Sequence, residues 1–109
     1  MAAEGRLQSW IVRELRRRGH YAIVICPPVE AGTPDILASV NGIFVGLEIK
    51  VGKGKPSKIQ KYRMTQISSS GGIAEVVKSR EELQQLLSRL EHTRLSGGLA
   101  TLLKQSLDY

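Results

Sequence analysis

Residues 35–51 read DILASVNGIFVGLEIKV, two mostly apolar runs that meet at Asn41-Gly42. Asn-Gly between such runs is typical of a β-hairpin, because a two-residue type I′ turn requires a positive φ angle at both central positions. Side chains alternate along each run, so one set of residues forms a continuous apolar face. We therefore predict two antiparallel strands, residues 35–40 and 43–51, with one face of the hairpin in the core.

The register of this hairpin decides which polar groups meet. If the turn contains two residues, Val40 faces Ile43, and counting back along both strands places Asp35 directly across from Glu48. Lys50 lies on the same face as both carboxylates, because successive side chains alternate sides. Opposed Cβ atoms lie ~5 Å apart, and like charges at that separation are destabilising. We therefore expect a compensating group beside the two acids.

Two opposed carboxylates next to an ammonium group indicate a metal-dependent hydrolase. Hard oxygen ligands at this separation can share one Mg²⁺ or Mn²⁺, and either ion also accepts phosphate oxygens as ligands. Lys50 would then orient an attacking water or stabilise negative charge that develops on a phosphate. The alternative interpretation is that Asp35 caps a turn and that Glu48 and Lys50 form a solvated ion pair. We favour the metal site because this pair ends an otherwise apolar run, where unpaired charge is costly.

The pattern around the hairpin predicts an α/β domain. Apolar residues recur at helical spacing in three segments, and two short apolar runs outside the hairpin are typical of strands. Ser57 is a good N-cap for one helix, and Ser79 with Glu82 forms a capping-box pattern for another. In chain order we expect a helix at 4–18, strands at 21–26, 35–40 and 43–51, a helix at 57–68, a strand at 73–77 and a helix at 79–90.

Length and composition describe one domain with a short tail. The 109 residues suffice for a single hydrophobic core, and the only cysteine, Cys26, excludes an internal disulfide framework and a cysteine-cluster zinc site. The first ten residues lack the pattern of a signal peptide and no run of 18 apolar residues is present, so we expect a cytoplasmic protein without a leader or a membrane partner. We assign residues 1–92 to the domain. The tail, residues 93–109, has leucines at helical spacing, which predict a short amphipathic helix that would dock on its own domain or on a second copy.

The charge distribution favours a partner with many phosphate groups, such as a nucleic acid. The formal net charge is +6, and residues 1–63 hold all of this excess, with 11 Lys and Arg against 5 Asp and Glu. Lys and Arg supply the sequence-independent part of nucleic-acid affinity. Aromatic residues make up only 5%, which argues against a platform for stacking bases. No phosphate-binding glycine motif is present, so we expect no nucleotide cofactor.

Gly32-Thr33-Pro34-Asp35, followed after 12 residues by Glu48-Ile49-Lys50, resembles the signature of the PD-(D/E)xK nucleases. With Gln60 at the start of the next helix and an early glutamate, Glu4, the sequence is similar more narrowly to the VRR-NUC family, whose short stand-alone members occur in phages and bacteria. The resemblance covers residues 4–87. It implies a restriction-endonuclease-like core with a mixed sheet flanked by helices, and metal-dependent hydrolysis of DNA phosphodiester bonds.

The resemblance also implies a role for each matching residue. Asp35 and Glu48 would be metal ligands, and the carbonyl of Ile49 would add a third. Lys50 would be the catalytic lysine, and Gln60 would be an accessory residue of the active site.

Glu4 would reach the metal from the first helix. At ~100° per residue it shares a helix face with Ile11 and Leu15, which we expect to point into the core. A solvated N-terminal glutamate is the alternative. Val51 departs from the family pattern, in which a threonine or another polar residue commonly follows the lysine.

Basic residues near the motif are candidates for binding the DNA backbone. The free N–H groups and positive dipole end of a helix N-terminus attract phosphate, so the basic loop before the helix of Gln60 could act as a clamp. A solvated surface loop is the competing interpretation. The candidates are Lys53, Lys55, Lys58, Lys61, Arg63 and Arg17.

Together these features predict a Mg²⁺- or Mn²⁺-dependent endodeoxyribonuclease that acts in a bacterial cell or a phage-infected host. No base-reading motif is present, so we expect recognition of DNA shape, such as a branch, a flap or a four-way junction. A domain this small grips one strand at a time, which favours a homodimer, as in stand-alone members of the family. Two alternatives remain: a non-catalytic nucleic-acid-binding module, and a sequence-specific endonuclease of the restriction or homing type.

Overall fold

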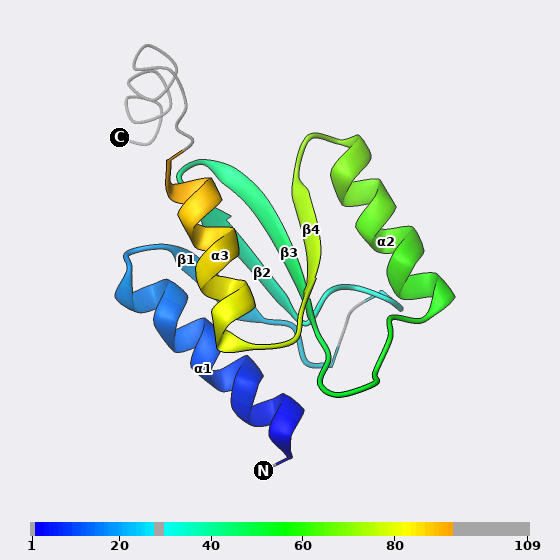
Figure 1. Cartoon of the computed structure of the whole chain (residues 1–109). Coiled ribbons are helices and arrows are strands. Elements are labelled where there is room, and N and C mark those ends of the chain that lie inside the picture. The colour runs from blue at the N-terminus through cyan, green and yellow to red at the C-terminus, as the bar shows by residue number, and fades with distance from the viewer. Residues whose placement is uncertain (1, 28–29, 93–109) are drawn as a thin grey trace.

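The computed structural model describes residues 2–27 and 30–92 of the chain. Its helices and strands follow the predicted order (Figure 1). Their bounds are α1 Ala3–Arg17, β1 Tyr21–Val24, β2 Ile36–Val40, β3 Ile43–Ile49, α2 Lys58–Ser69, β4 Ile73–Val77 and α3 Arg80–Glu91. None of these helices has the length and apolar character needed to cross a membrane. The helix predicted within residues 93–109 lies outside the described residues.

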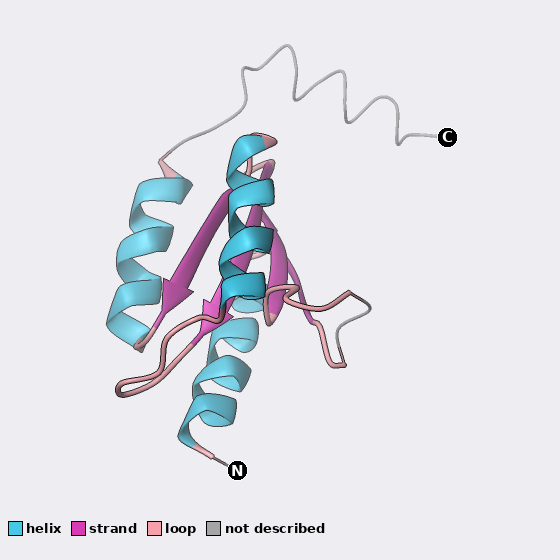
Figure 2. Ribbon diagram, turned by 90° about the vertical axis from the view of Figure 1, so that its right-hand side faces the viewer, coloured by secondary structure: helices cyan, strands magenta, loops and turns pink. Residues whose placement is uncertain are grey.

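The strands form one mixed sheet in the order β1-β2-β3-β4. β2 is antiparallel to both of its neighbours, whereas β3 and β4 are parallel. α1 and α3 pack against one face of this sheet, and α2 lies against the other face beside β3 and β4 (Figure 2). The architecture is therefore the predicted α/β fold, a mixed sheet flanked by helices.

The hairpin has the predicted turn and register. Asn41 and Gly42 have φ angles of 52° and 84°, as a type I′ turn requires. Val40 pairs with Ile43, and the same register continues to the start of β2. The side-chain amide of Asn41 donates to the last two carbonyls of α3, at 3.4 and 3.1 Å, so the turn is fixed to the helical layer.

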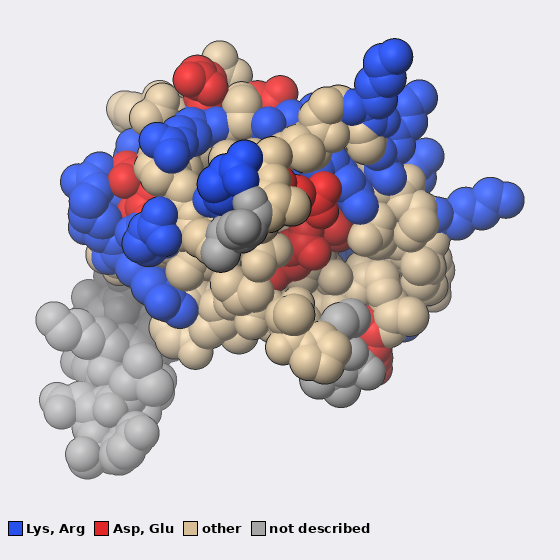
Figure 3. All heavy atoms as spheres, turned by 90° about the horizontal axis from the view of Figure 1, so that it is seen from below, with Lys and Arg blue, Asp and Glu red and all other residues tan. Residues whose placement is uncertain are grey.

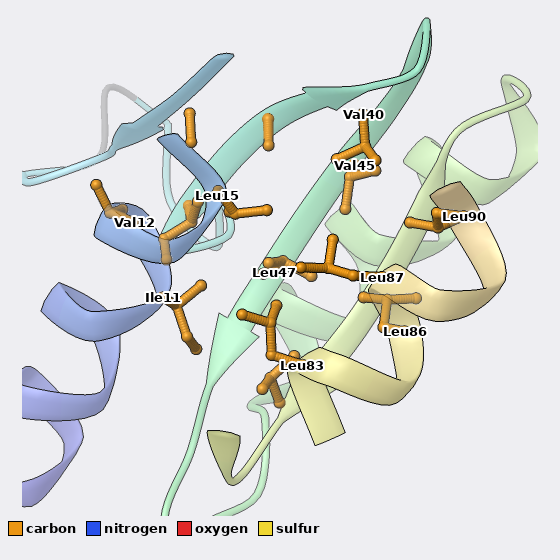
Figure 4. Packing of buried hydrophobic residues seen from close by; sticks show 14 of the residues in the cluster. Ile11, Val12, Leu15, Val40, Val45, Leu47, Leu83, Leu86, Leu87 and Leu90 are labelled. Carbon is orange, nitrogen blue, oxygen red and sulfur yellow. The ribbon is translucent and has the colours of Figure 1, made fainter. Parts of the chain in front are cut away.

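One face of the hairpin is buried beneath α1 and α3 (Figure 4). Leu47 and Ile49 on β3 contribute to this core together with Ile11 on α1 and with Leu83 and Leu87 on α3, and each is at most 1% exposed. Complete burial of one such side chain stabilises the fold by about 1.5–3 kcal/mol. The core thus anchors the end of β3 from one side, and its polar side chains project from the opposite face.

Three strands are shorter than predicted, and β2 begins at Ile36 rather than Asp35. β1 ends at Val24, shortly before Pro27, which has no N–H to donate to a ladder. β3 ends at Ile49, and the N–H of the next residue, Lys50, donates to the Val77 carbonyl at the end of β4 (3.2 Å). Both strand ends lie near the edge of the sheet where the predicted acidic residues are found.

Serine side chains cap the two later helices. Ser57 accepts a hydrogen bond from the Gln60 N–H, and the Gln60 side chain accepts one from the Ser57 N–H, which completes a capping box at α2. Ser79 accepts from the Glu82 N–H at the start of α3. The Glu82 carboxylate accepts from the N–H of Lys78 rather than Ser79 (2.9 Å), so the second half of the expected box is displaced by one residue.

Candidate active site

The candidate active site lies at the edge of the sheet where β2 begins and β3 ends. Asp35 directly precedes β2, and Glu48 is the penultimate residue of β3. Extending the observed register by one pair places these residues opposite each other, as predicted. Figure 3 shows this end of the molecule: acidic atoms gather near the middle of the face, with Lys and Arg atoms on both sides.

Asp35 is held by strands on both sides. Its backbone carbonyl accepts from the N–H of Ile25, just beyond β1, and its Oδ2 accepts from the N–H of Ile49, each at 2.8 Å. In a continuing antiparallel ladder the Ile49 N–H would bond to the backbone of Pro34. The carboxylate therefore replaces a backbone acceptor at the point where β2 stops. These two bonds fix where it lies relative to Glu48.

Glu48 is the one charged residue in the buried part of the described chain, with 1% of its surface exposed. Its Oε1 accepts from Nε2 of Gln60 (3.1 Å), whereas its Oε2 is buried without a hydrogen-bond partner among the described residues. Burial raises the pKa of Glu48 to about 8, and the neighbouring Asp35 carboxylate adds to this increase. A buried acid with an unused oxygen is costly unless a proton or a cation joins it.

Gln60 connects this acid to the start of α2. The side-chain oxygen of Gln60 accepts from the Ser57 N–H (2.8 Å), so the amide nitrogen is directed to Glu48. The capping box therefore sets the orientation of the amide as well as the start of the helix. The spacing of Ser57 and Gln60 carries this information in the sequence, although we predicted only the serine cap.

Lys50 and Glu4 complete the charged surroundings of Glu48. The positive charge of half-buried Lys50 opposes the increase in the pKa of Glu48, and the negative charge of Glu4 adds to it. Glu4 lies in the first turn of α1, so that turn approaches the site. Among the described residues, however, no three His, Cys, Asp or Glu side chains form a group that could hold a metal ion. The structure thus brings together two carboxylates and leaves Glu4 in their surroundings.

The oxygen atoms at this edge fit a divalent cation. Asp35 and Glu48 supply carboxylates, and Oε2 of Glu48 lacks a partner in the described part of the chain. The N–H and C=O of one strand residue point toward the same neighbouring strand, so the Ile49 carbonyl lies on the side of Asp35. Carboxylate and carbonyl oxygens are the ligands that Mg²⁺ and Mn²⁺ prefer. A bound cation would also offset the repulsion between the two acids.

The predicted DNA-binding residues lie in different places, and the side chains of two of them have partners within the protein. Arg63 is bonded to the carbonyl of Ala31, in the loop before β2. Arg17 pairs with Glu14 at 2.6 Å near the end of α1, about 20 Å from the first turn at 1.5 Å per residue, so it is not brought to the site. The lysine candidates are exposed on α2 and on the segment that precedes it: Lys53, Lys55, Lys58 and Lys61.

A solved structure described as "VRR_NUC domain" superposes on 81% of this chain and on 97% of its own length, with a TM-score of 0.71. The chain has the fold of a VRR_NUC domain. The two proteins share 22% sequence identity, so the likeness confirms the predicted restriction-endonuclease-like architecture. The sequence matches no protein-family model and no curated protein.

Proposed function

We propose that this chain, with its VRR_NUC fold, is a Mg²⁺- or Mn²⁺-dependent endodeoxyribonuclease. The observation that carries the proposal is the buried Glu48 carboxylate, which lies beside Asp35 with one oxygen unpartnered in the described structure. Burying an acid beside another acid destabilises a fold, so such an arrangement indicates a functional role. The nuclease signature in the sequence and the shared fold support the same conclusion.

The residues of the chain divide the work of phosphodiester hydrolysis. Asp35, Glu48 and the Ile49 carbonyl would hold the cation, which when bound would polarise the phosphate and lower the pKa of a water. Gln60 keeps the Glu48 carboxylate in place by its hydrogen bond. Lys50, which directly follows β3 and whose charge acts on Glu48, would supply a positive charge where negative charge accumulates in the transition state.

DNA binding would rest on the exposed lysines around α2. Lys53 and Lys55 lie between the end of β3 and α2, shortly after the candidate catalytic lysine, and Lys58 is the first residue of α2. Contacts of this kind hold the phosphate backbone without reading bases. We therefore propose selectivity for DNA shape, with branched, flapped or four-way DNA as substrates.

A cleavage assay with supercoiled plasmid, a flap and a synthetic four-way junction tests the activity. The assay is run with Mn²⁺, Mg²⁺ or EDTA. We expect Glu48→Gln and Lys50→Ala to reduce cutting by about 10²-fold or more, while binding at low salt is retained. Glu81→Gln, an exposed acid on α3, is the matched control and should cut normally. Unchanged cutting in both site variants would refute the assignment, and cutting at one fixed sequence would favour a restriction or homing type of enzyme.

A non-catalytic nucleic-acid-binding module is the second candidate. The observation in its favour is the raised pKa of Glu48, because a proton held between Glu48 and Asp35 would also relieve their repulsion. This function predicts DNA binding that is unaffected by EDTA and no cutting with any divalent ion. Calorimetric titration with Mn²⁺ separates the two functions, since only the nuclease requires the cation to bind at the carboxylates.

We further propose that two copies associate through the open sheet face, defined by Tyr21, Ile23, Leu37 and Phe44. α2 leaves this part of the sheet uncovered, and Tyr21 and Phe44 are 68% and 50% exposed. The pocket at this face, about 200 Å³, is lined by these four residues with Ala38 and Ser39 and by no charged side chain. Arg63 and Glu30, which line the adjoining pocket with Leu37 and Phe44, lie 3.7 Å from each other and offset each other's charge. Two copies of a chain with net charge +6 can therefore meet at the uncharged part of this face.

Sedimentation velocity tests this association. We expect a dimer for the unmodified chain and a monomer for Phe44→Glu. Tyr62→Glu changes an aromatic residue of α2 that is 56% exposed and is not one of the four residues of the open sheet face, and it should leave the dimer intact. A monomeric unmodified chain, or a Phe44→Glu variant that still dimerises, would overturn the proposal.

A further inference from the structure

We propose that Arg63 is a positioning residue of the candidate active site, which fixes the loop before β2 against α2 and thereby sets the place of the Asp35 carboxylate. The catalytic importance of this role rests on the proposed nuclease function, whereas the role itself does not. From the sequence, Arg63 was a candidate for binding DNA. In the structure, the guanidinium of Arg63 instead contacts the loop that leads to Asp35.

The guanidinium of Arg63 is occupied on several sides. Its Nε donates to the carbonyl of Ala31 and its Nη1 donates to Oε1 of Gln66, each at 2.9 Å. Its Nη2 lies 3.7 Å from a carboxylate oxygen of Glu30, and its Cζ lies 5.7 Å from the centre of the Tyr62 ring. A planar group with donors in fixed directions can make these contacts together, whereas a lysine ammonium cannot.

The loop that Arg63 holds is itself closely packed. Thr33 folds it into a turn, because its Oγ1 donates to the Glu30 carbonyl at 2.6 Å. Gly32 has a φ angle of +81°, and a Cβ at this position would lie 2.7 Å from the backbone oxygen of Ile59 in the first turn of α2. Only glycine allows this approach, so the loop lies directly on the helix. Asp35 follows two residues after Thr33.

One helix therefore controls both acids. Gln60 in the first turn of α2 bonds Glu48, and Arg63, three residues later, bonds the loop that leads to Asp35. α2 has no fully buried side chain. Polar contacts consequently contribute more to its placement than they do for α1 and α3, whose leucines and isoleucines fill the core.

The test compares Arg63→Ala, Arg63→Lys and the control Lys61→Ala, which changes an exposed neighbour on the same helix. The first readout is hydrogen exchange of the Ile49 amide, measured by NMR in EDTA, because this N–H donates to Oδ2 of Asp35. We expect exchange to accelerate by about fivefold or more in both Arg63 variants, the effect of losing roughly one hydrogen bond. The Val45 amide in the middle of β3 should be unchanged in both variants, and the Ile49 amide should be unchanged in Lys61→Ala.

The second readout separates positioning from a phosphate contact. If Arg63 positions Asp35, both Arg63 variants lose Mn²⁺ affinity in calorimetry, while the salt dependence of DNA binding stays that of the unmodified chain. A phosphate contact predicts the reverse: Arg63→Ala lowers the salt slope by about one, and Arg63→Lys restores it. That result, or an Ile49 amide that does not respond, would overturn the inference. If the amide responds but the unmodified chain cuts no DNA, positioning stands and the proposed function fails.

Discussion

Replacing Glu48 by glutamine should stabilise the fold, and the gain should depend on pH. Glutamine keeps an oxygen that accepts from Gln60 and places an NH₂ group where Oε2 of Glu48 has no partner among the described residues. The substitution also removes a carboxyl that is difficult to ionise beside Asp35. Ionisation of Glu48 therefore lowers the free energy of unfolding of the unmodified chain, and the variant has no such loss.

The size of this loss follows from the pKa of Glu48. Moving a carboxyl pKa from 4.5 to about 8 corresponds to about 5 kcal/mol once the group is fully ionised, at 1.36 kcal/mol for each tenfold change. Because the pKa is raised in the folded state, the stability is fully present below pH 4.5 and is lost as the pH rises through 8. At pH 7 about two thirds of the loss, ~3 kcal/mol, is expected, which corresponds to a difference of about 15 °C in Tm.

Urea and thermal unfolding in EDTA at pH 4, 7 and 8.5 provide the measurement. Glu48→Gln should exceed the unmodified chain in stability at pH 7 and more so at pH 8.5, and the difference should nearly disappear at pH 4. Glu81→Gln, the exposed control, should show no such trend. A difference that is the same at all three pH values, or a variant that is less stable throughout, would refute the reasoning.

Three further outcomes follow from the structure. Mn²⁺ should raise the Tm of the unmodified chain but not the Tm of Asp35→Asn. The affinity for Mn²⁺ should increase as the pH rises toward 8, because binding displaces the proton of Glu48, and an affinity that does not depend on pH would contradict this. Gly32→Ala should destabilise the fold by about 2 kcal/mol or more in urea unfolding, because residue 32 has a positive φ and the added Cβ would contact the Ile59 backbone. A neutral effect would show that the loop can move away from α2. The pKa of Glu91 is lowered by its hydrogen bond to His20 and by Arg18. The stabilisation that ionised Glu91 gives the fold is therefore present above pH 4.5 and is lost as the pH falls through the lowered pKa. In a pH series of thermal unfolding, Glu91→Gln should reduce stability at pH 6 and have little effect at pH 2.

The hairpin was predictable from the sequence because its information is local. Asn41 and Gly42 determine the turn, and the turn determines the register that brings Asp35 opposite Glu48. No knowledge of distant parts of the chain was needed. For the same reason the helix starts at Ser57 and Ser79 were visible in the sequence.

The burial of Glu48 and the role of Arg63 were not predictable in this way. Glu48 is buried because α2 closes over the second face of β3, and Gly46 permits that approach: a Cβ there would lie 2.8 Å from the Ile67 side chain. A glycine within a strand is a signal of close approach, but it does not say which element approaches. Likewise, a basic residue on a helix next to a basic loop resembles a phosphate contact until the path of residues 30–33 is known.

The capping box of α2 gives the first helical turn two simultaneous tasks. The amide of Gln60 closes the helix start with Ser57 and at the same moment provides the hydrogen bond to the buried acid. When that turn unfolds, Glu48 loses the hydrogen bond from Gln60, and when Glu48 is displaced, the turn loses its bond to β3. Formation of this helical turn and placement of the Glu48 carboxylate in the candidate active site are therefore coupled, and a chain that has formed the sheet alone has Asp35 opposite Glu48 without the donor that orients the Glu48 side chain.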